Sequence, residues 1–227
     1  MEKSRKTAKL NGLRTKNAQQ IFEFFEKHDP RPQTELIYST NFSFLVAVML
    51  SAQATDKSVN KIMAQNLKAL ENPDAILAHD EQHLADLIKS INYYKTKARH
   101  IYEMSKMLID DFSGEVPLVF DDLLKLHGVG SKTARVVLNV LAGTSDIGVD
   151  THVFRVSRRL GLSRADTPEE LNEDLYEIIP QNFWNRVNHW LVLHGRYVCS
   201  AQAPKCEKCH VRNLCPWHNA KSLSSDI

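Results

Sequence analysis

One stretch of the chain, Leu126 to His152, combines a glycine-flanked turn, a helix and an aspartate that precedes a second helix. It reads LHGVGSKTARVVLNVLAGTSDIGVDTH. Gly128 and Gly130 flank Val129, so the backbone there can turn sharply and approach a ligand closely. The helix that follows directs its unpaired N–H groups and the positive end of its dipole toward the same place. This pattern favours an anionic ligand, and phosphate is the obvious one.

Lys132 falls in the first turn of that helix. On a period of 3.6 residues the apolar side chains form one face, and Lys132, Arg135 and Asn139 form another that points away from the core. A helix N-terminus disfavours an ammonium group, and burial in a cleft would add to this effect. Both effects favour the neutral amine, which attacks carbonyl-like carbons.

Asp150 stands where the next helix is expected to begin, and aspartate readily caps a helix N-terminus. A capping carboxylate is held ionised and oriented. That is also what general-base or oxocarbenium-stabilising work beside a lysine requires. Asp150 therefore suits both roles, whereas we expect the neighbouring His152 to be structural.

The four cysteines of the chain all lie near its end, with six, two and five residues between them: Cys199, Cys206, Cys209 and Cys215. Such clustering without an export signal favours a metal site over disulfides and predicts a reducing compartment, the cytoplasm. Four thiolates in so short a segment can close on one tetrahedral ion or one iron–sulfur cluster. Spacing alone leaves both open.

Composition suits one or two compact domains, because 43% of the 227 residues are hydrophobic and 25% are charged. A net charge of +2 argues neither for nor against nucleic acid. The basic segment Lys3 to Lys16 has no apolar run, so we expect a solvated arm that grazes DNA, with an organelle-targeting peptide as the alternative. No apolar run approaches the length of a membrane span.

Helical periodicity dominates and strand-like alternation is scarce, which predicts an all-α fold. The helix Phe42 to Gln53, capped by Asn41, is apolar nearly all round and should be buried. Further helices are expected at Asn17 to Lys27, Thr55 or Asp56 to about Leu70, Glu81 to Ser90, Lys95 to Phe112, Phe120 to Lys125, Thr151 to Leu160, Thr167 to Ile179 and Gln181 to His194.

LHGVGSKTA followed by VDTH, with SAQATD at 51–56 and the four-cysteine tail, resembles the helix-hairpin-helix DNA glycosylases, and most closely their endonuclease III branch. The resemblance runs from about Thr34 to Pro216. It implies two helical domains that flank a DNA-binding cleft. One is a six-helix domain, 34–144, with the helix-hairpin-helix at about 121–142. The other is a discontinuous iron–sulfur domain, 1–33 and 145–227.

The resemblance also implies residue roles. Lys132 would attack the anomeric carbon of a damaged nucleoside, and Asp150 would assist. Gln53 would fill the space left by the flipped nucleotide. Asn92 replaces a glycine of the family, and asparagine tolerates the positive φ such a turn needs. Tyr93 then takes the position of a wedge beside the estranged base.

Several positions depart from the family pattern. His127 stands where relatives commonly have proline, and Ser131 where many have arginine, although Ser131 can itself cap the helix. The phosphate contacts of Gly128 and Gly130 come from backbone and should persist.

By the same resemblance, the cysteines bind a [4Fe–4S] cluster that orders the loop between Cys199 and Cys206 for contact with DNA. Relatives carry many basic residues in that loop, whereas this chain offers only Lys205 before Cys206. Lys208 and Arg212 follow and can compensate.

The implied function is base-excision repair by a monomer acting on duplex DNA with damaged pyrimidines or abasic sites, by glycosylase and lyase steps. Three alternatives remain: a monofunctional glycosylase for mismatched bases, a non-catalytic DNA-binding module, and an iron–sulfur redox sensor. Lys132 argues against the first, and the joint presence of Lys132, Asp150 and Gln53 argues against the second.

Overall fold

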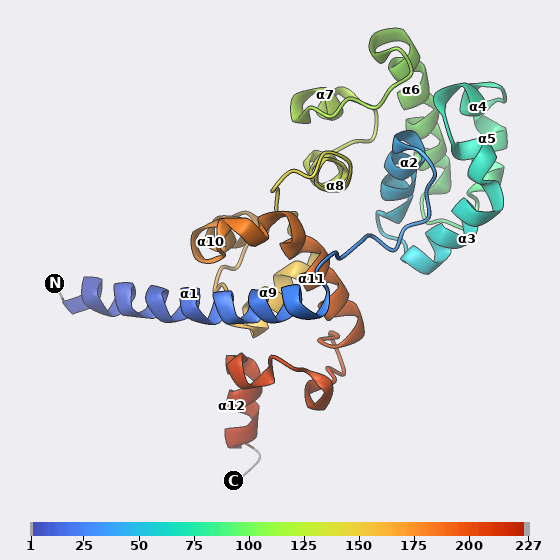
Figure 1. Cartoon of the computed structure of the whole chain (residues 1–227). Coiled ribbons are helices and arrows are strands. Elements are labelled where there is room, and N and C mark those ends of the chain that lie inside the picture. Colours follow the sequence, from blue (N-terminus) through green and yellow to red (C-terminus); the bar gives the residue numbers. More distant parts are fainter. Residues whose placement is uncertain (1, 225–227) are drawn as a thin grey trace. The chain divides into compact units, whose positions relative to one another are not determined.

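The structure is a computed structural model that describes the backbone of residues 2–224 and the side chains of residues 14–220. Within these ranges the regular elements are all helices, so the all-α prediction is confirmed (Figure 1). None of the described helices combines the length and the apolar character needed to cross a membrane. In the predicted basic arm, Lys3 to Lys16, the side chains up to residue 13 lie outside the described residues. Contact of that arm with DNA stays a prediction.

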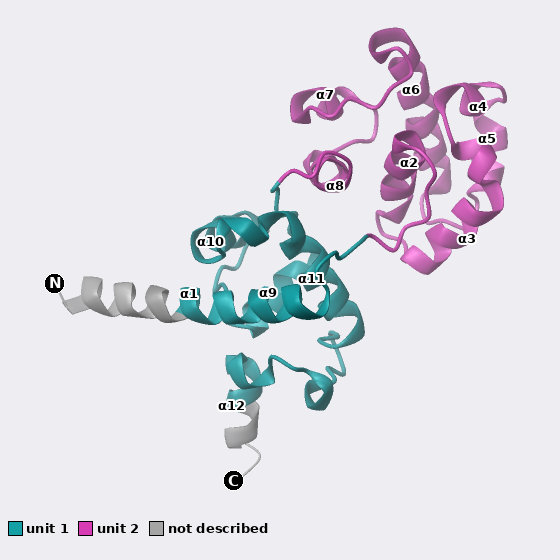
Figure 2. Ribbon diagram, in the orientation of Figure 1, with its two compact units in different colours: residues 1–33, 145–227 teal, residues 34–144 magenta. Residues whose placement is uncertain are grey.

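The chain divides into two compact units (Figure 2). Unit 2 is the continuous segment 34–144, and unit 1 combines 1–33 with 145–227. Each unit has its own hydrophobic core.

Unit 2 contains seven α-helices and one 3-10 helix: α2 (Asn41–Ser51), α3 (Asp56–Asn66), η1 (Leu67–Leu70), α4 (Pro73–Leu77), α5 (Glu81–Leu87), α6 (Tyr94–Phe112), α7 (Phe120–Lys125) and α8 (Ser131–Leu141). The sequence pattern did not predict α4, which is a single short turn of helix. Asn72 caps it by accepting a hydrogen bond from the Ala75 N–H at 2.8 Å, and Pro73 occupies its first position.

Helix α2 is central, as its apolar composition predicts. Every residue from Phe42 to Leu50 is buried, and α3, α6 and α8 pack against it. The predicted cap at Asn41 is wrong by one residue. Thr40 is the N-cap, because its hydroxyl accepts from the Ser43 N–H at 3.0 Å while the Ser43 hydroxyl accepts from the Thr40 N–H at 2.9 Å. This reciprocal pair satisfies two donors that Asn41 could satisfy only in part.

Unit 1 contains five α-helices and three short 3-10 turns: α1 (Glu2–His28), α9 (Thr151–Arg159), α10 (Pro168–Ile178), η2 (Gln181–Phe183), α11 (Trp184–Tyr197), η3 (Cys206–Lys208), η4 (Arg212–Leu214) and α12 (Pro216–Ser224). The aromatic face predicted near the N-terminus is buried, with Phe22 and Phe25 against Trp190. Helices α9 and α11 pack together. Asp150 immediately precedes α9, and α11 leads into the cysteine tail.

Candidate active site and cysteine centre

The glycine turn joins α7 to α8 in unit 2. Gly128 has φ +76, and a Cβ there would lie 2.8 Å from both His100 Cβ and Met49 Cε. Both the left-handed backbone and the close approach therefore require glycine at this position. Val129 is buried and fixes the turn to the core, whereas Gly130 has an ordinary negative φ and is the N-cap of α8.

The N-terminus of α8 has no hydrogen bond from a capping side chain among the described residues. The prediction that Ser131 caps the helix is wrong, because Gly130 is the N-cap and Ser131 is already the first helical residue. A side chain at that position cannot take the N-cap geometry. The first-turn N–H groups thus suit an external anion, which agrees with the phosphate prediction.

Lys132 is exposed in this first turn, and Ala134, Val137 and Leu138 on the other face are buried, as the helical period predicts. Asn139 is an exception. The period assigns it to the polar face, yet it is buried and its side-chain amide donates to the Thr144 carbonyl at 2.9 Å. It therefore helps to close the end of α8.

Two exposed loops of unit 2 carry the predicted intercalating residues. Gln53 has φ +55 and Tyr93 has φ +59, both left-handed, and Tyr93 is 66% exposed. The prediction placed the positive φ at Asn92, which is wrong by one residue. Tyr93 is the left-handed N-cap of α6, and Asn92 instead donates its side-chain amide to the Gln53 carbonyl at 3.0 Å.

Asp150 in unit 1 is the N-cap of α9, as predicted. Its carboxylate accepts a hydrogen bond from the Val153 N–H at 2.7 Å, and the residue is half-buried. Burial lowers the pKa of the neighbouring His152, and Arg155 lowers it further, while the Asp150 carboxylate acts in the opposite direction. A neutral imidazole packed beside Arg155 agrees with a structural role for His152.

Lys132 and Asp150 belong to different units. Their cooperation therefore stays a prediction. What the structure adds is local. Both residues lie at a helix N-terminus, Lys132 as an exposed side chain in the first turn of α8 and Asp150 as the N-cap of α9.

The four cysteines line one pocket of unit 1, whose empty volume is about 310 Å³, part of it open to solvent. None of the four forms a disulfide. Burial raises the pKa of both Cys209 and Cys215, so a cationic ligand is needed to stabilise their thiolates. Among the described residues, no three metal-ligating side chains gather closely enough to hold a single ion. The chemistry of the set, four thiols facing one pocket, still fits a thiolate-bound group.

Two arginines of α9 hold the start of the cysteine tail. Arg159 donates to the Ser200 carbonyl at 2.7 Å and the Ala201 carbonyl at 2.8 Å, and its Nη1 lies 3.5 Å from Cys199 Sγ. One turn earlier, Arg155 donates to the Cys199 carbonyl at 3.1 Å. Sequence reasoning missed this network. The only signal for it is the spacing of the two arginines, four residues apart on the helix that follows VDTH.

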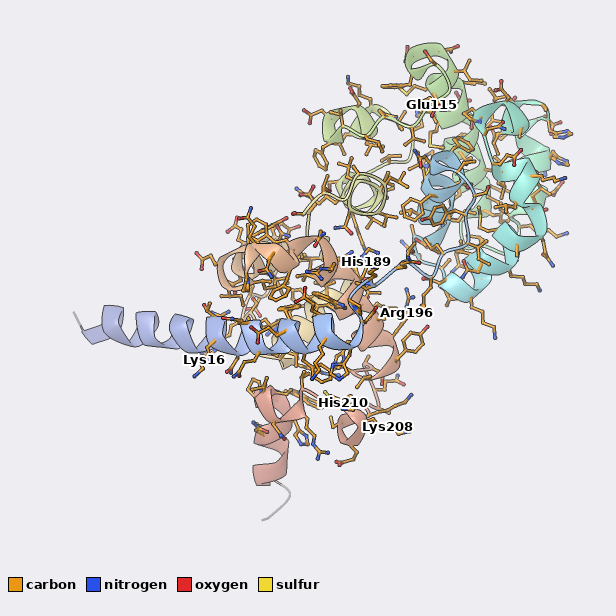
Figure 3. The ribbon with its side chains drawn as sticks, viewed as in Figure 1. Lys16, Glu115, His189, Arg196, Lys208 and His210 are labelled. Carbon is orange, nitrogen blue, oxygen red and sulfur yellow. The ribbon has the colours of Figure 1, made fainter. Side chains whose placement is uncertain are left out.

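The basic residues near the cysteines are not equivalent. Lys205 is exposed, and its backbone N–H donates to the Val198 carbonyl at 2.8 Å, which closes the loop. Lys208 is also exposed and, like His210, lies between α11 and α12 (Figure 3). Arg212 pairs with the Glu207 carboxylate at 3.0 Å. Lys208 therefore fits the predicted compensating role better than Arg212.

Residues 46–181 match the HhH-GPD superfamily of base excision DNA repair proteins, and the chain belongs to this family. It is thus a DNA-binding repair enzyme of the glycosylase and lyase class, which confirms the main prediction and sets aside the non-catalytic module. Relatives named Endonuclease III include one from Rickettsia felis, 46% identical over 204 residues that cover 90% of this chain and 96% of that protein. Another, from Escherichia coli K12, is 40% identical over 198 residues, covering 87% and 94%.

Solved structures agree. A non-covalent Endonuclease III–DNA complex superimposes with a TM-score of 0.82 at 40% identity, covering 90% of this chain and 96% of that one. A trapped covalent Endonuclease III–DNA intermediate with an estranged adenine gives a TM-score of 0.81 at 40% identity, with coverage of 88% and 95%. The predicted resemblance to the endonuclease III branch is confirmed.

Proposed function

We propose that this enzyme removes oxidised pyrimidines from duplex DNA and then cleaves the resulting abasic site, with Lys132 as the nucleophile and Asp150 as its assistant. The observation that carries the proposal is the exposed amine of Lys132 in the first turn of α8, directly after the Gly128 turn and the bare helix cap. A phosphate bound to those N–H groups would bring the DNA backbone to the amine.

In the proposed reaction the free amine of Lys132 attacks the sugar C1′. The glycosidic bond between C1′ and the base nitrogen then breaks, and the base leaves with the electron pair of that bond. Loss of the amine proton and ring opening give a Schiff base between Lys132 and C1′. Removal of a C2′ proton then expels the 3′ phosphate by β-elimination. The trapped covalent complex of an Endonuclease III relative supports a covalent route of this kind.

The carboxylate of Asp150 would accept the proton that Lys132 loses, or stabilise the positive charge that develops on the sugar. Its hydrogen bond from the Val153 N–H fixes the orientation that either task requires. Because one oxygen is used as the cap, the other oxygen of the carboxylate remains for the reaction.

The proposed substrates are ring-saturated, oxidised pyrimidines in duplex DNA, together with abasic sites. Loss of aromaticity weakens stacking, so such a base is extruded at a lower free-energy cost than an intact one. Gln53 would then fill the vacated space and Tyr93 would contact the opposite strand. Phosphate contacts would come from the backbone of Gly128 and Gly130.

Cys199, Cys206, Cys209 and Cys215 would hold a [4Fe–4S] cluster, and when bound this group supplies a covalent crosslink that orders the tail. Lys205 and Lys208 would then meet the DNA backbone. Four cysteines without a disulfide suit a reducing compartment, and we expect a cytoplasmic monomer. Iron and sulfide analysis of the purified protein separates this proposal from a zinc site, which would give one zinc ion and no sulfide.

The catalytic proposal is tested by borohydride trapping on a duplex that contains one thymine glycol. The intact protein should form a covalent adduct and Lys132→Ala should form none. The matched control is Lys125→Ala. Lys125 is an exposed lysine in the other helix of the hairpin, paired with Asp122 at 2.7 Å, and its variant should trap DNA normally.

Base release by the intact protein without any adduct or nick would place it among the monofunctional glycosylases. An adduct that persists in Lys132→Ala would assign the nucleophile to another amine. Asp150→Asn should slow the single-turnover rate while leaving binding of abasic-analogue DNA intact, since Asp150 would act on the reaction rather than on the complex.

A further inference from the structure

The end of α2 and the start of α6 are fastened together by side chains at two points. Asn92 donates to the Gln53 carbonyl at 3.0 Å. Lys97, in the first turn of α6, donates to the Leu50 carbonyl at 2.7 Å and the Ala52 carbonyl at 2.6 Å. The loop that carries Gln53 is thus bound, through its own carbonyls, to the element that carries Tyr93.

The Lys97 contact is a buried one. The residue is 9% exposed, and its ammonium group meets the last carbonyls of α2, where the helix dipole is negative and the carbonyls lack partners within the helix. This contact fixes where α2 ends. It leaves Gln53 as the first residue beyond the fixed point.

The Asn92 contact joins Gln53, which has a strained backbone, to the residue that precedes Tyr93, which has another. Gln53, at φ +55, and Tyr93, at φ +59, are two of the three left-handed residues other than glycine in the described part of the chain. Such conformations are unfavourable for ordinary residues and persist where the surroundings impose them. The Gln53 carbonyl is oriented by this conformation and accepts the Asn92 hydrogen bond.

We propose that Asn92 is a positioning residue that couples the Gln53 loop to the Tyr93 loop, so that the two side chains enter DNA as one unit. The inference rests on the proposed DNA contacts of Gln53 and Tyr93. A glycine at position 92 would have no side-chain donor, so the coupling depends on the asparagine. DNA that covers the loops would exclude water and strengthen an otherwise exposed hydrogen bond.

The test is a pair of double-mutant cycles on Gln53→Ala and Tyr93→Ala, one with Asn92 and one with Asn92→Gly. The readout is the dissociation constant for a duplex that contains a tetrahydrofuran abasic analogue. Gln53→Ala keeps the backbone carbonyl, so the hydrogen bond itself survives in the cycle. With Asn92 present, the fold-increase in the dissociation constant of the double variant should be smaller than the product of the two single fold-increases. We expect the difference to be at least about 3-fold.

In the Asn92→Gly background the same losses should multiply to within about 1.5-fold, as they do for independent sites. Asn92→Leu, which removes the donor and keeps the bulk, should give the same result and separates the hydrogen bond from glycine flexibility. The matched control is Asn60→Leu. Asn60 donates to the Glu35 carbonyl at 2.7 Å in the same unit, and its loss should leave the coupling unchanged.

Single losses that multiply even with Asn92 present would overturn the inference and leave the proposed function standing. Coupling that survives both Asn92→Gly and Asn92→Leu would overturn it too. If neither single substitution weakens binding, the DNA contacts assigned to Gln53 and Tyr93 fail, and the inference fails with them. The trapping experiment on Lys132 would still decide the catalytic proposal separately.

Discussion

The two units fix their functional residues by different forces. In unit 2 the Gln53 loop and the glycine turn extend from helices buried in an apolar core, with Phe44, Leu45 and Leu50 fully buried in α2. In unit 1 the cysteine tail contains few buried side chains, and directional hydrogen bonds from Arg155 and Arg159 hold it. Burial of apolar side chains is non-directional, so it stabilises a helix without selecting particular partner atoms. The hydrogen bonds of the arginines are directional, so they select particular carbonyl groups. The two sites should therefore respond differently to substitution.

The largest expected effect is in the core of unit 2. Leu45→Ala should lower the free energy of unfolding by about 2–5 kcal/mol, because it removes a fully buried side chain and leaves a cavity. Urea denaturation followed by circular dichroism measures this loss. The control is Leu124→Ala, the same chemical change at a residue that is 41% exposed. Equal losses at the two positions would contradict the picture of α2 as the centre of an apolar core.

A smaller and more local effect is expected in unit 1. Arg159→Ala should cost about 1.5–3 kcal/mol, the range for hydrogen bonds from a charged group, and should make the segment after Cys199 sensitive to protease. Arg158→Ala is the matched control. Its guanidinium pairs at 3.0 Å with Asp166, whose side chain is 86% exposed, and a surface pair of this kind contributes less than about 1 kcal/mol. Protease resistance retained in Arg159→Ala would contradict the role of Arg159 in ordering the tail.

This contrast also explains what the sequence could predict. Periodicity predicted the helix faces of α8 and the burial of α2, because apolar residues at regular spacing leave few other solutions. It did not predict the burial of Asn139, because that burial depends on a hydrogen bond to a carbonyl five residues away. It did not predict the cap at Thr40 either, because that cap depends on the side chain of Ser43 as well. The Asn92 and Arg159 contacts join segments 39 and 41 residues apart. No local pattern encodes contacts of that kind.

Among the site residues, local reasoning sufficed where the chemistry is local. The capping by Asp150 follows from its own sequence neighbourhood, and the need for glycine at position 128 follows from the motif. The positive φ of Tyr93 could not be predicted in this way. Asparagine adopts that conformation more often than tyrosine does, and Asn92 is the adjacent residue. The tertiary hydrogen bond to Gln53 uses the Asn92 side chain instead.

The cap of α9 offers a way to separate stability from chemistry within unit 1. Asp150→Ala should lower the free energy of unfolding by about 1 kcal/mol, as for other N-caps, and should also slow base release. Thr167→Ala removes the equivalent cap of α10, where the Thr167 hydroxyl accepts from the Glu170 N–H at 3.3 Å, and should cost similar stability with normal activity. Asp150→Ser should recover most of the stability and none of the rate, as measured by denaturation and single-turnover kinetics. Recovery of the rate by serine would mean that the cap alone matters.

The smallest effect concerns pH and two half-buried histidines of unit 1, His189 and His194. Burial lowers the pKa of His189, and Asp29 offsets this only in part. The folded pKa is then below the unfolded value of about 6.5. Above that pH the His189 imidazole is neutral in both the folded and the unfolded protein, and its contribution to stability is fully present. As pH falls below it, the unfolded state binds the proton first and stability decreases until pH passes the folded pKa.

His189→Gln should therefore reduce the loss of stability between pH 7 and pH 5, measured as the difference between variant and parent in urea denaturation at each pH. His194, whose pKa burial lowers to about 4, contributes a change of the same sign, but it is present in both proteins and cancels in that difference. His79→Gln, which replaces an exposed histidine of unit 2, is the control and should change the loss of stability less than His189→Gln does. An equal effect from His79→Gln would locate the acid sensitivity outside the half-buried histidines of unit 1.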